Sequence, residues 1–309
     1  MLRILDSGLF TTIQDAGRWG YQAYGVPVSG AMDLPALSVA NQLVRNSRDE
    51  AALEIHSPVA LRTNAPHLIA LTGADARFEI NGRALPMGMS VFARAGATIE
   101  IAPKRAGGWI YLAIHGGIDV PRVLGSKSTF LRGKFGGLEG RALAAGDHIH
   151  IGAPTLDDLV AAAGRSVGVS SMRFSATDGD ESPTTNIRVI LGPHADWFTP
   201  EAIAALTRAE FIVAETADRM GYRLIAPSPL RRGVRGEVEL ISCGVPFGAI
   251  QVPPDGQPIV LMADHQTTGG YPIIAMVVSE DIARVAQSVP GDRLMFRAVT
   301  LEGKTIIRE

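Results

Sequence analysis

Glycine and proline recur so often along this chain that long helices cannot dominate its fold. The sequence has 309 residues, and its 34 glycines and 19 prolines separate short apolar segments. This spacing favours many short strands joined by turns. Alternating or apolar runs that we interpret as strands lie at 68–71, 76–80, 90–93, 98–101 and 109–114, with an Asn81-Gly82 hairpin turn after the second. The sequence therefore predicts a mainly β protein.

The composition indicates a folded chain that does not bind a polyanion. Hydrophobic residues make up 46% of the sequence, and the formal net charge is only −2. We therefore expect no nucleic-acid partner. We also expect no membrane span, because no uncharged apolar run reaches the ~18 residues of a membrane helix. The first residues lack the apolar core of a signal peptide, so we expect a cytoplasmic protein.

Metal and disulfide chemistry have little support in the sequence. The single cysteine, Cys243, excludes a disulfide framework and a cysteine-rich zinc site. His148 and His150 alternate on one predicted strand, but they lack an acidic or cysteine partner at the customary spacing. We predict no metal site in this chain.

The length is sufficient for two domains, and a polar segment indicates where they divide. Residues 152–186 are rich in Ser, Gly, Asp, Thr and Ala, a composition that does not form a core strand. We predict an N-terminal domain over residues 1–160, a linker over 161–186 and a C-terminal domain over 187–309. The C-terminal strands are expected at 187–191, 237–241, 249–252 and 259–262.

Two helices and one possible duplication complete the expected organisation. One helix is predicted at 33–44, with Asp33 as its N-cap and Pro35 in its first turn, and another at 195–206. Each half ends with a Gly-Asp turn before an alternating strand, at 146–147 and 291–292. This similarity is consistent with a duplicated β unit or with chance.

Three segments concentrate small, polar and charged residues between predicted strands. Segment 25–33 places Ser29 and Gly30 before a helix start, where N–H groups can bind an anion or simply cap the helix. Segment 218–223 combines two arginines with a tyrosine. Segment 264–272 begins with seven polar or flexible residues, which is more hydrogen-bonding capacity than a plain turn needs.

Two further motifs carry weaker signals. Gly125-Ser126-Lys127-Ser128 is not a Walker A loop, because Val120 occupies the position of its first glycine. It is either a polar turn or a loop whose N–H groups and Lys127 bind an anion. Cys243 is more typical of a small buried side chain than of a nucleophile, and no G-x-S-x-G elbow supports a serine triad.

The sequence resembles the biotin-dependent carboxyltransferase family in the three polar segments 25–33, 218–223 and 264–272. This family is also called the allophanate hydrolase subunit 2 family and includes the C subunit of 5-oxoprolinases. The resemblance extends from about Leu2 to Phe296 and includes the segments 11–18, 116–120, 136–141 and 248–253. It implies two tandem cyclophilin-like β-barrel domains with a few short helices. It also implies a cyclophilin-like partner, the B subunit, and in 5-oxoprolinases a third chain, the A subunit. Such complexes hydrolyse 5-oxo-L-proline to L-glutamate at the expense of ATP, with Mg.

The sequence departs from the family pattern at two places. Phe130 follows Ser128-Thr129 where relatives commonly have Asp, and Cys243 stands where they have His. The run 266–271 matches and favours a 5-oxoprolinase over a urea carboxylase. The Met-Lys-Met biotin-attachment signature is absent from the sequence, so any biotin is expected on a separate carrier chain.

The resemblance suggests roles for residues of the matching segments. Asp264 is the candidate general base or polar anchor, and Arg219 is the other catalytic candidate. With Lys127, Arg219 would balance the charge of a phosphate or carboxylate. Tyr222 would form a wall of the pocket. The remaining substrate-binding candidates are Ser29, Gly30, Asp33, Gln251, Gln266, Thr267, Thr268, Gly269 and Gly270.

Two other functions are compatible with the same family. One is biotin-dependent carboxyl transfer in a system of the urea carboxylase or allophanate hydrolase type. The other is a non-catalytic protein that binds and antagonises a kinase inhibitor. Activity of the chain alone is not implied by any of the three.

Overall fold

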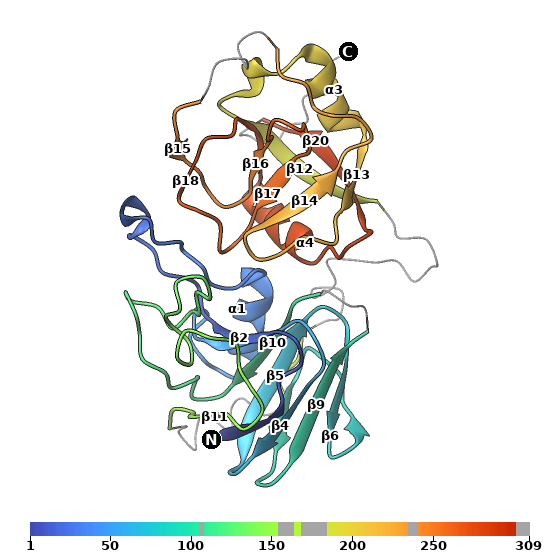
Figure 1. The fold of residues 1–309 in the computed structure, drawn as a ribbon. Helices are drawn as coiled ribbons and strands as arrows, with labels where there is room; N and C mark the ends of the chain where they lie inside the picture. The colour runs from blue at the N-terminus through green and yellow to red at the C-terminus, as the bar shows by residue number, and fades with distance from the viewer. Residues whose placement is uncertain (105–107, 154–163, 168–183, 234–239, 301–309) are drawn as a thin grey trace. The chain divides into compact units, whose positions relative to one another are not determined.

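The computed structural model describes residues 1–104, 108–153, 164–167, 184–233 and 240–300. The chain forms two compact units, one of Met1–Gly20 and Val28–Phe174 and the other of Tyr21–Pro27 and Ser175–Glu309. Both are built mainly from short strands, as predicted, and the helices are few and short (Figure 1). Most of the predicted linker at 161–186 falls outside the described residues, so the predicted boundaries remain a prediction. No helix of the described ranges is long and apolar enough to cross a membrane.

The first unit consists of two sheets that enclose one core. The six-stranded sheet has the order β11-β1-β4-β9-β6-β7, formed by β1 (Leu2–Asp6), β4 (Val59–Thr63), β6 (Ala76–Ile80), β7 (Arg83–Ala84), β9 (Thr98–Pro103) and β11 (His148–Ile149). The five-stranded sheet has the order β2-β3-β10-β5-β8, formed by β2 (Thr11–Gln14), β3 (Ala52–Ile55), β5 (His67–Gly73), β8 (Ser90–Ala93) and β10 (Ile110–Ile114). Asn81 and Gly82, both with positive φ, form the predicted turn between β6 and β7.

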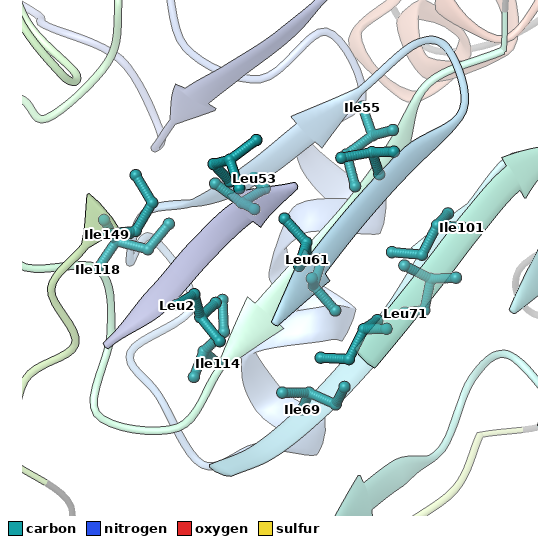
Figure 2. Packing of buried hydrophobic residues seen from close by; sticks show 14 of the residues in the cluster. Leu2, Leu53, Ile55, Leu61, Ile69, Leu71, Ile101, Ile114, Ile118 and Ile149 are labelled. Atoms are coloured by element: carbon teal, nitrogen blue, oxygen red, sulfur yellow. The ribbon is translucent and has the colours of Figure 1, made fainter. Parts of the chain in front are cut away.

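Side chains from both sheets pack together in this core. Figure 2 shows the cluster, which includes Leu2, Leu61, Ile101, Leu53, Leu71 and Ile114. Helix α1 (Leu34–Leu43) packs against β5 and β10, and Thr72 Oγ1 donates to Ala36 O at 2.7 Å. Both strands are therefore apolar on two faces, one toward the core and one toward the helix. This explains why their sequences are continuous apolar runs rather than alternating ones.

The second unit contains a closed seven-stranded barrel. Its strand order is β12-β19-β16-β17-β14-β13-β20, and the parallel pair β12 and β20 closes it. The strands are β12 (Thr185–Leu191), β13 (Glu210–Val213), β14 (Gly221–Ile225), β16 (Ala249–Gln251), β17 (Ile259–Leu261), β19 (Ile273–Val277) and β20 (Arg293–Ala298). A separate two-stranded ribbon joins β15 (Cys243–Gly244) to β18 (Thr268–Gly269). Of the predicted strand at 237–241, residues 237–239 lie outside the described residues, and Ile241 is not in a strand.

The remaining helices are brief and lie between strands. They are η1 (Gln22–Tyr24), η3 (Ala195–Trp197), α3 (Pro200–Arg208), η5 (Ser279–Asp281) and α4 (Ile282–Ala286). The prediction of one continuous helix at 195–206 is wrong, because the chain is extended at Phe198 and Thr199. Pro200 disfavours a helical conformation at the preceding residue, and Thr199 instead caps α3 by accepting from Ala202 N at 3.2 Å.

The two Gly-Asp turns have the same local structure. Gly146 and Gly291 both have positive φ, of 96° and 90°. In each turn the aspartate carboxylate accepts from a backbone N–H three residues earlier, Ala144 N to Asp147 at 2.7 Å and Val289 N to Asp292 at 2.9 Å. The similarity therefore extends from the sequence to the hydrogen bonds of the two turns, and the duplicated β unit remains a prediction.

Candidate functional site

The candidate residues fall into two clusters, one in each unit. Ser29, Gly30, Asp33 and Lys127 belong to the first unit. Arg219, Tyr222, Gln251 and the segment 264–270 belong to the second. Each cluster is described by itself.

Asp15 is the centre of the cluster in the first unit. Its buried carboxylate accepts hydrogen bonds from Ser126 Oγ at 2.7 Å, Ser128 Oγ at 2.5 Å and Lys127 N at 2.6 Å. A fourth donor, Gly17 N, lies 2.8 Å from Asp15 Oδ1. The loop at 125–128 was predicted to be either a polar turn or a loop that binds an anion. In the structure its donors bind the carboxylate of Asp15.

The ammonium of Lys127 is also engaged within the unit. Its Nζ lies 2.7 Å from Glu50 Oε1 and 2.7 Å from Ile118 O. The loop's N–H, its hydroxyls and its lysine are thus bound to Asp15, Glu50 and Ile118. In this arrangement the loop does not fit the phosphates of ATP. Substrate binding by Lys127 remains a prediction that requires the ion pair to open.

The segment before helix α1 is held by Asp15 and by the buried carboxylate of Glu54. Ala31 N donates to Asp15 O at 2.9 Å, and Met32 N donates to Glu54 Oε2 at 2.9 Å. Gly30 has a φ of 86° and lies so close to Gly17 that a Cβ would be 2.8 Å from Gly17 N. Only glycine fits both constraints at position 30.

Asp33 has the capping role that its sequence predicts. Its carboxylate accepts from Ala36 N at 2.9 Å, and its own N–H donates to Tyr111 Oη at 2.8 Å. Tyr111 Oη in turn donates to Glu54 Oε2 at 2.8 Å. Burial, followed by the charges of Glu54 and Asp33, raises the pKa of Tyr111 well above its usual value. This phenol therefore remains a hydrogen-bond donor.

Ser29 is the unusual member of this segment. It is a non-glycine residue in the left-handed region, with a φ of 55°, and it is only 4% exposed. Its hydroxyl makes no hydrogen bond within the described part of the chain. Strained backbone and unpaired buried polar groups both cost stability and are concentrated at functional sites. Ser29 therefore remains a good candidate for binding a ligand.

The second cluster is built on a strand pair. Strands β14 and β17 are antiparallel, with Gly221 opposite Leu261, so residues just before β14 lie opposite residues just after β17. Arg219 and Asp264 meet there, with Nε 2.8 Å from Oδ2 and Nη2 3.0 Å from Oδ1. Both side chains are buried. A carboxylate with both oxygens on a guanidinium is better suited to be a polar anchor than a general base.

Tyr222 follows Arg219 by three positions in the sequence, and His265 directly follows Asp264. The buried Tyr222 hydroxyl donates to Ala286 O at 2.8 Å, which fixes the ring to α4. His265 Nδ1 lies 2.6 Å from Gln266 O, so this nitrogen carries the proton. Burial lowers the pKa of His265, which keeps the imidazole neutral at pH 7. A pocket-lining role for Tyr222 remains a prediction.

Two glutamines form a hydrogen-bonded chain beside the β15–β18 ribbon. Gln251 Nε2 donates to Tyr271 O at 3.1 Å, and Gln266 Nε2 donates to Gln251 Oε1 at 3.2 Å. Thr267 O accepts from Val245 N at 3.1 Å. Thr268 and Gly269 form β18 opposite Gly244 and Cys243, and Gly270 follows them at the surface. The structure thus brings together five predicted residues: Gln251, Gln266, Thr267, Thr268 and Gly269.

Some residues of these clusters were missed by sequence reasoning. Asp15 lies within a segment that matched the family, but nothing in the sequence identified its carboxylate as the ligand of the 126–128 loop. Glu54 had a detectable signal, because it interrupts the apolar residues of β3 and is fully buried. Within the described residues, no group of three or more His, Cys, Asp or Glu side chains is arranged to hold a metal.

Comparison with known proteins gives consistent results over most of the chain. Residues 24–298 match the family described as carboxyltransferase domain, subdomain A and B. The 5-oxoprolinase C subunit of Escherichia coli (strain K12) is 38% identical over 303 residues, which cover 98% of this chain and 92% of that protein. The urea amidolyase of Saccharomyces cerevisiae (strain ATCC 204508 / S288c) is 32% identical over 318 residues, covering 100% of this chain but 17% of that protein.

A solved structure shows the same architecture. The crystal structure of TTHA0988 superimposes with a TM-score of 0.80 at 32% sequence identity, and the match covers 96% of this chain. This chain spans 55% of the length of that one.

Proposed function

This chain belongs to the carboxyltransferase domain family, and from that premise we propose that it is the C subunit of an ATP-dependent 5-oxoprolinase. In this proposal it acts with the A and B subunits to hydrolyse 5-oxo-L-proline to L-glutamate. The observation that carries the proposal is the 38% identity to a 5-oxoprolinase C subunit over 92% of that protein's length. The enzyme activity belongs to the complex.

The second unit supplies the groups that we propose for binding the ring. The buried pair of Arg219 and Asp264 serves as a rigid polar anchor, because each side chain neutralises the charge of the other and two hydrogen bonds hold them together. Gln266 and the hydroxyls of Thr267 and Thr268 hydrogen-bond the substrate amide.

We assign ATP and Mg to the assembled complex and not to the loop around Lys127. Opening a lactam requires an electrophilic carbonyl carbon, and ATP supplies this activation to the complex as a whole. Lys127 and the loop around it are bound to Asp15 and Glu50, which argues against a phosphate site there. In the overall reaction one water adds to the carbonyl carbon, the ring C–N bond breaks, and the released nitrogen takes a proton to become the amino group of glutamate. A second water takes up the γ-phosphoryl group of ATP, which leaves as phosphate together with ADP.

The alternative is biotin-dependent carboxyl transfer, which the 32% identity to a urea amidolyase favours. Biotin would then be delivered on a separate carrier chain. A carboxyltransferase needs no net hydrolysis of the ring, so the reaction product distinguishes the two functions.

The test is glutamate release by the complex of this chain with the A and B subunits, supplied with ATP and 5-oxoproline. We expect glutamate with the natural chain and a strongly reduced rate with Asp264→Asn, because an amide cannot pair with both guanidinium nitrogens as a carboxylate does. Asp255→Asn is the matched control, since within the described residues this exposed carboxylate of the same unit accepts one hydrogen bond, from Gln257 N at 2.9 Å. Absence of glutamate from the natural complex contradicts the proposal, whereas an undiminished rate with Asp264→Asn removes only Asp264 from it.

A further inference from the structure

The orientation of the Gln251 amide is fixed by a backbone carbonyl. Gln251 is 1% exposed, and its Nε2 lies 3.1 Å from Tyr271 O. A carbonyl oxygen can only accept, so the nitrogen end of the amide must face Tyr271 and Oε1 must face the other way. Gly269 leaves space for this arrangement, because a Cβ at that position would be 2.7 Å from Gln251 Nε2.

Gln251 in turn fixes Gln266. Its Oε1 accepts from Gln266 Nε2 at 3.2 Å, and a rotated Gln266 amide would place two oxygens together. Gln266 is half-buried, and its Oε1 has no hydrogen-bond partner among the described residues. The chain of contacts therefore leaves Gln266 with an oriented acceptor and a second N–H.

We infer that Gln251 is a positioning residue that orients Gln266 to bind a ring amide, with Gln266 Oε1 accepting from the ring N–H and Gln266 Nε2 donating to the adjacent ring carbonyl. The ligand class is a cyclic cis-amide, in which donor and acceptor are neighbours. The lactam of 5-oxoproline and the ureido ring of biotin both have this edge. The inference rests on the proposed function only for the choice of the lactam.

The experiment measures dissociation constants of ligands with the assembled complex, without ATP. The probes are 5-oxoproline, the γ-lactone that has a ring oxygen in place of the N–H, and free biotin. We expect the natural complex to bind the lactam about tenfold more tightly than the lactone, because the lactone leaves the Gln266 acceptor unpaired. Selective binding of biotin instead would identify the ureido ring as the source and would contradict 5-oxoproline as the substrate while supporting the inference.

Two variants test the positioning role from opposite sides. Gln251→Met removes both hydrogen bonds at similar size, and Gly269→Ala displaces the Gln251 amide without removing it. In both we expect the preference for the lactam to fall to about twofold or less, since a freed Gln266 amide can rotate. Gln257→Met is the matched control, because Gln257 Oε1 accepts from Ala226 N at 2.7 Å elsewhere in the same unit. Its lactam preference should equal that of the natural chain.

The preference, rather than the affinity, is the decisive quantity. General structural damage weakens lactam and lactone alike and leaves their ratio unchanged. An unchanged ratio in folded Gln251→Met and Gly269→Ala overturns the inference, even when the natural complex hydrolyses 5-oxoproline. Equal binding of lactam and lactone by the natural complex, or binding of neither ring amide, also overturns it.

Discussion

Replacement of Asp15 by alanine should destabilise the first unit far more than replacement of an exposed aspartate does. The buried carboxylate of Asp15 accepts from two backbone N–H groups, Gly17 N and Lys127 N, and from two hydroxyls. The hydroxyls can rotate toward new partners, but the two N–H groups lose theirs. A buried unpaired donor costs about 1–3 kcal/mol, so we expect a loss of about 4 kcal/mol for Asp15→Ala.

The assay is equilibrium unfolding in urea, with calorimetry to separate the transitions of the two units. A loss of this size in a unit of this length should lower its melting temperature by about 8 to 16 °C. Asp6→Ala is the matched control, because Asp6 is an exposed aspartate of the same unit that accepts from one backbone N–H, Gly8 N at 2.9 Å. Asp15→Asn should be intermediate, since its amide nitrogen would face Lys127 N. If Asp15→Ala and Asp6→Ala lose the same free energy, the central place given to Asp15 is wrong.

Three more predictions concern other positions. Gly30→Ala should lower the free energy of unfolding by about 3 kcal/mol, because strain at positive φ adds to the clash with Gly17, whereas Gly25→Ala has open space and should lose only about 1 kcal/mol in the same urea titration. Burial and the nearby N-terminal amine lower the pKa of His67 to about 4, so the unfolded imidazole gains its proton near pH 6.5 but the folded one does not. Stability should therefore fall by up to about 3 kcal/mol from pH 7 to pH 4, and His67→Gln should lose this dependence in unfolding curves across that range. Arg219→Met leaves the Asp264 carboxylate buried and alone and should cost about 4 kcal/mol, most of which the double variant with Asp264→Leu regains; calorimetry that finds the single and double variants equal would contradict this.

Much of the fold was predictable because its determinants are local. The helix at α1 was predicted with its cap, since Asp33 and Pro35 act on the first turn next to them. The Asn81-Gly82 hairpin was predicted for the same reason. The prediction of one helix over 195–206 was wrong in the middle, because Pro200 disfavours a helical conformation at the residue before it.

The candidate site was predictable only in part, because its contacts are long-range. The polar segments were identified from their composition, but no local pattern shows that Asp15 is the ligand of a loop 111 residues away. The pairing of Arg219 with Asp264 depends on the β14–β17 register, which the sequence does not specify. Their mutual neutralisation favours the polar anchor over the general base, the two roles that the resemblance suggested for Asp264.

The most direct test of the proposed function is the coupling of ATP hydrolysis to ring opening in the complex of this chain with the A and B subunits. The measurement records phosphate and glutamate together, with 5-oxoproline as substrate and urea as the control. We predict that 5-oxoproline stimulates phosphate release, that glutamate forms in a fixed ratio to it, and that urea has no effect. A stable complex whose ATP hydrolysis is indifferent to 5-oxoproline, or responds to urea instead, would contradict the proposed function.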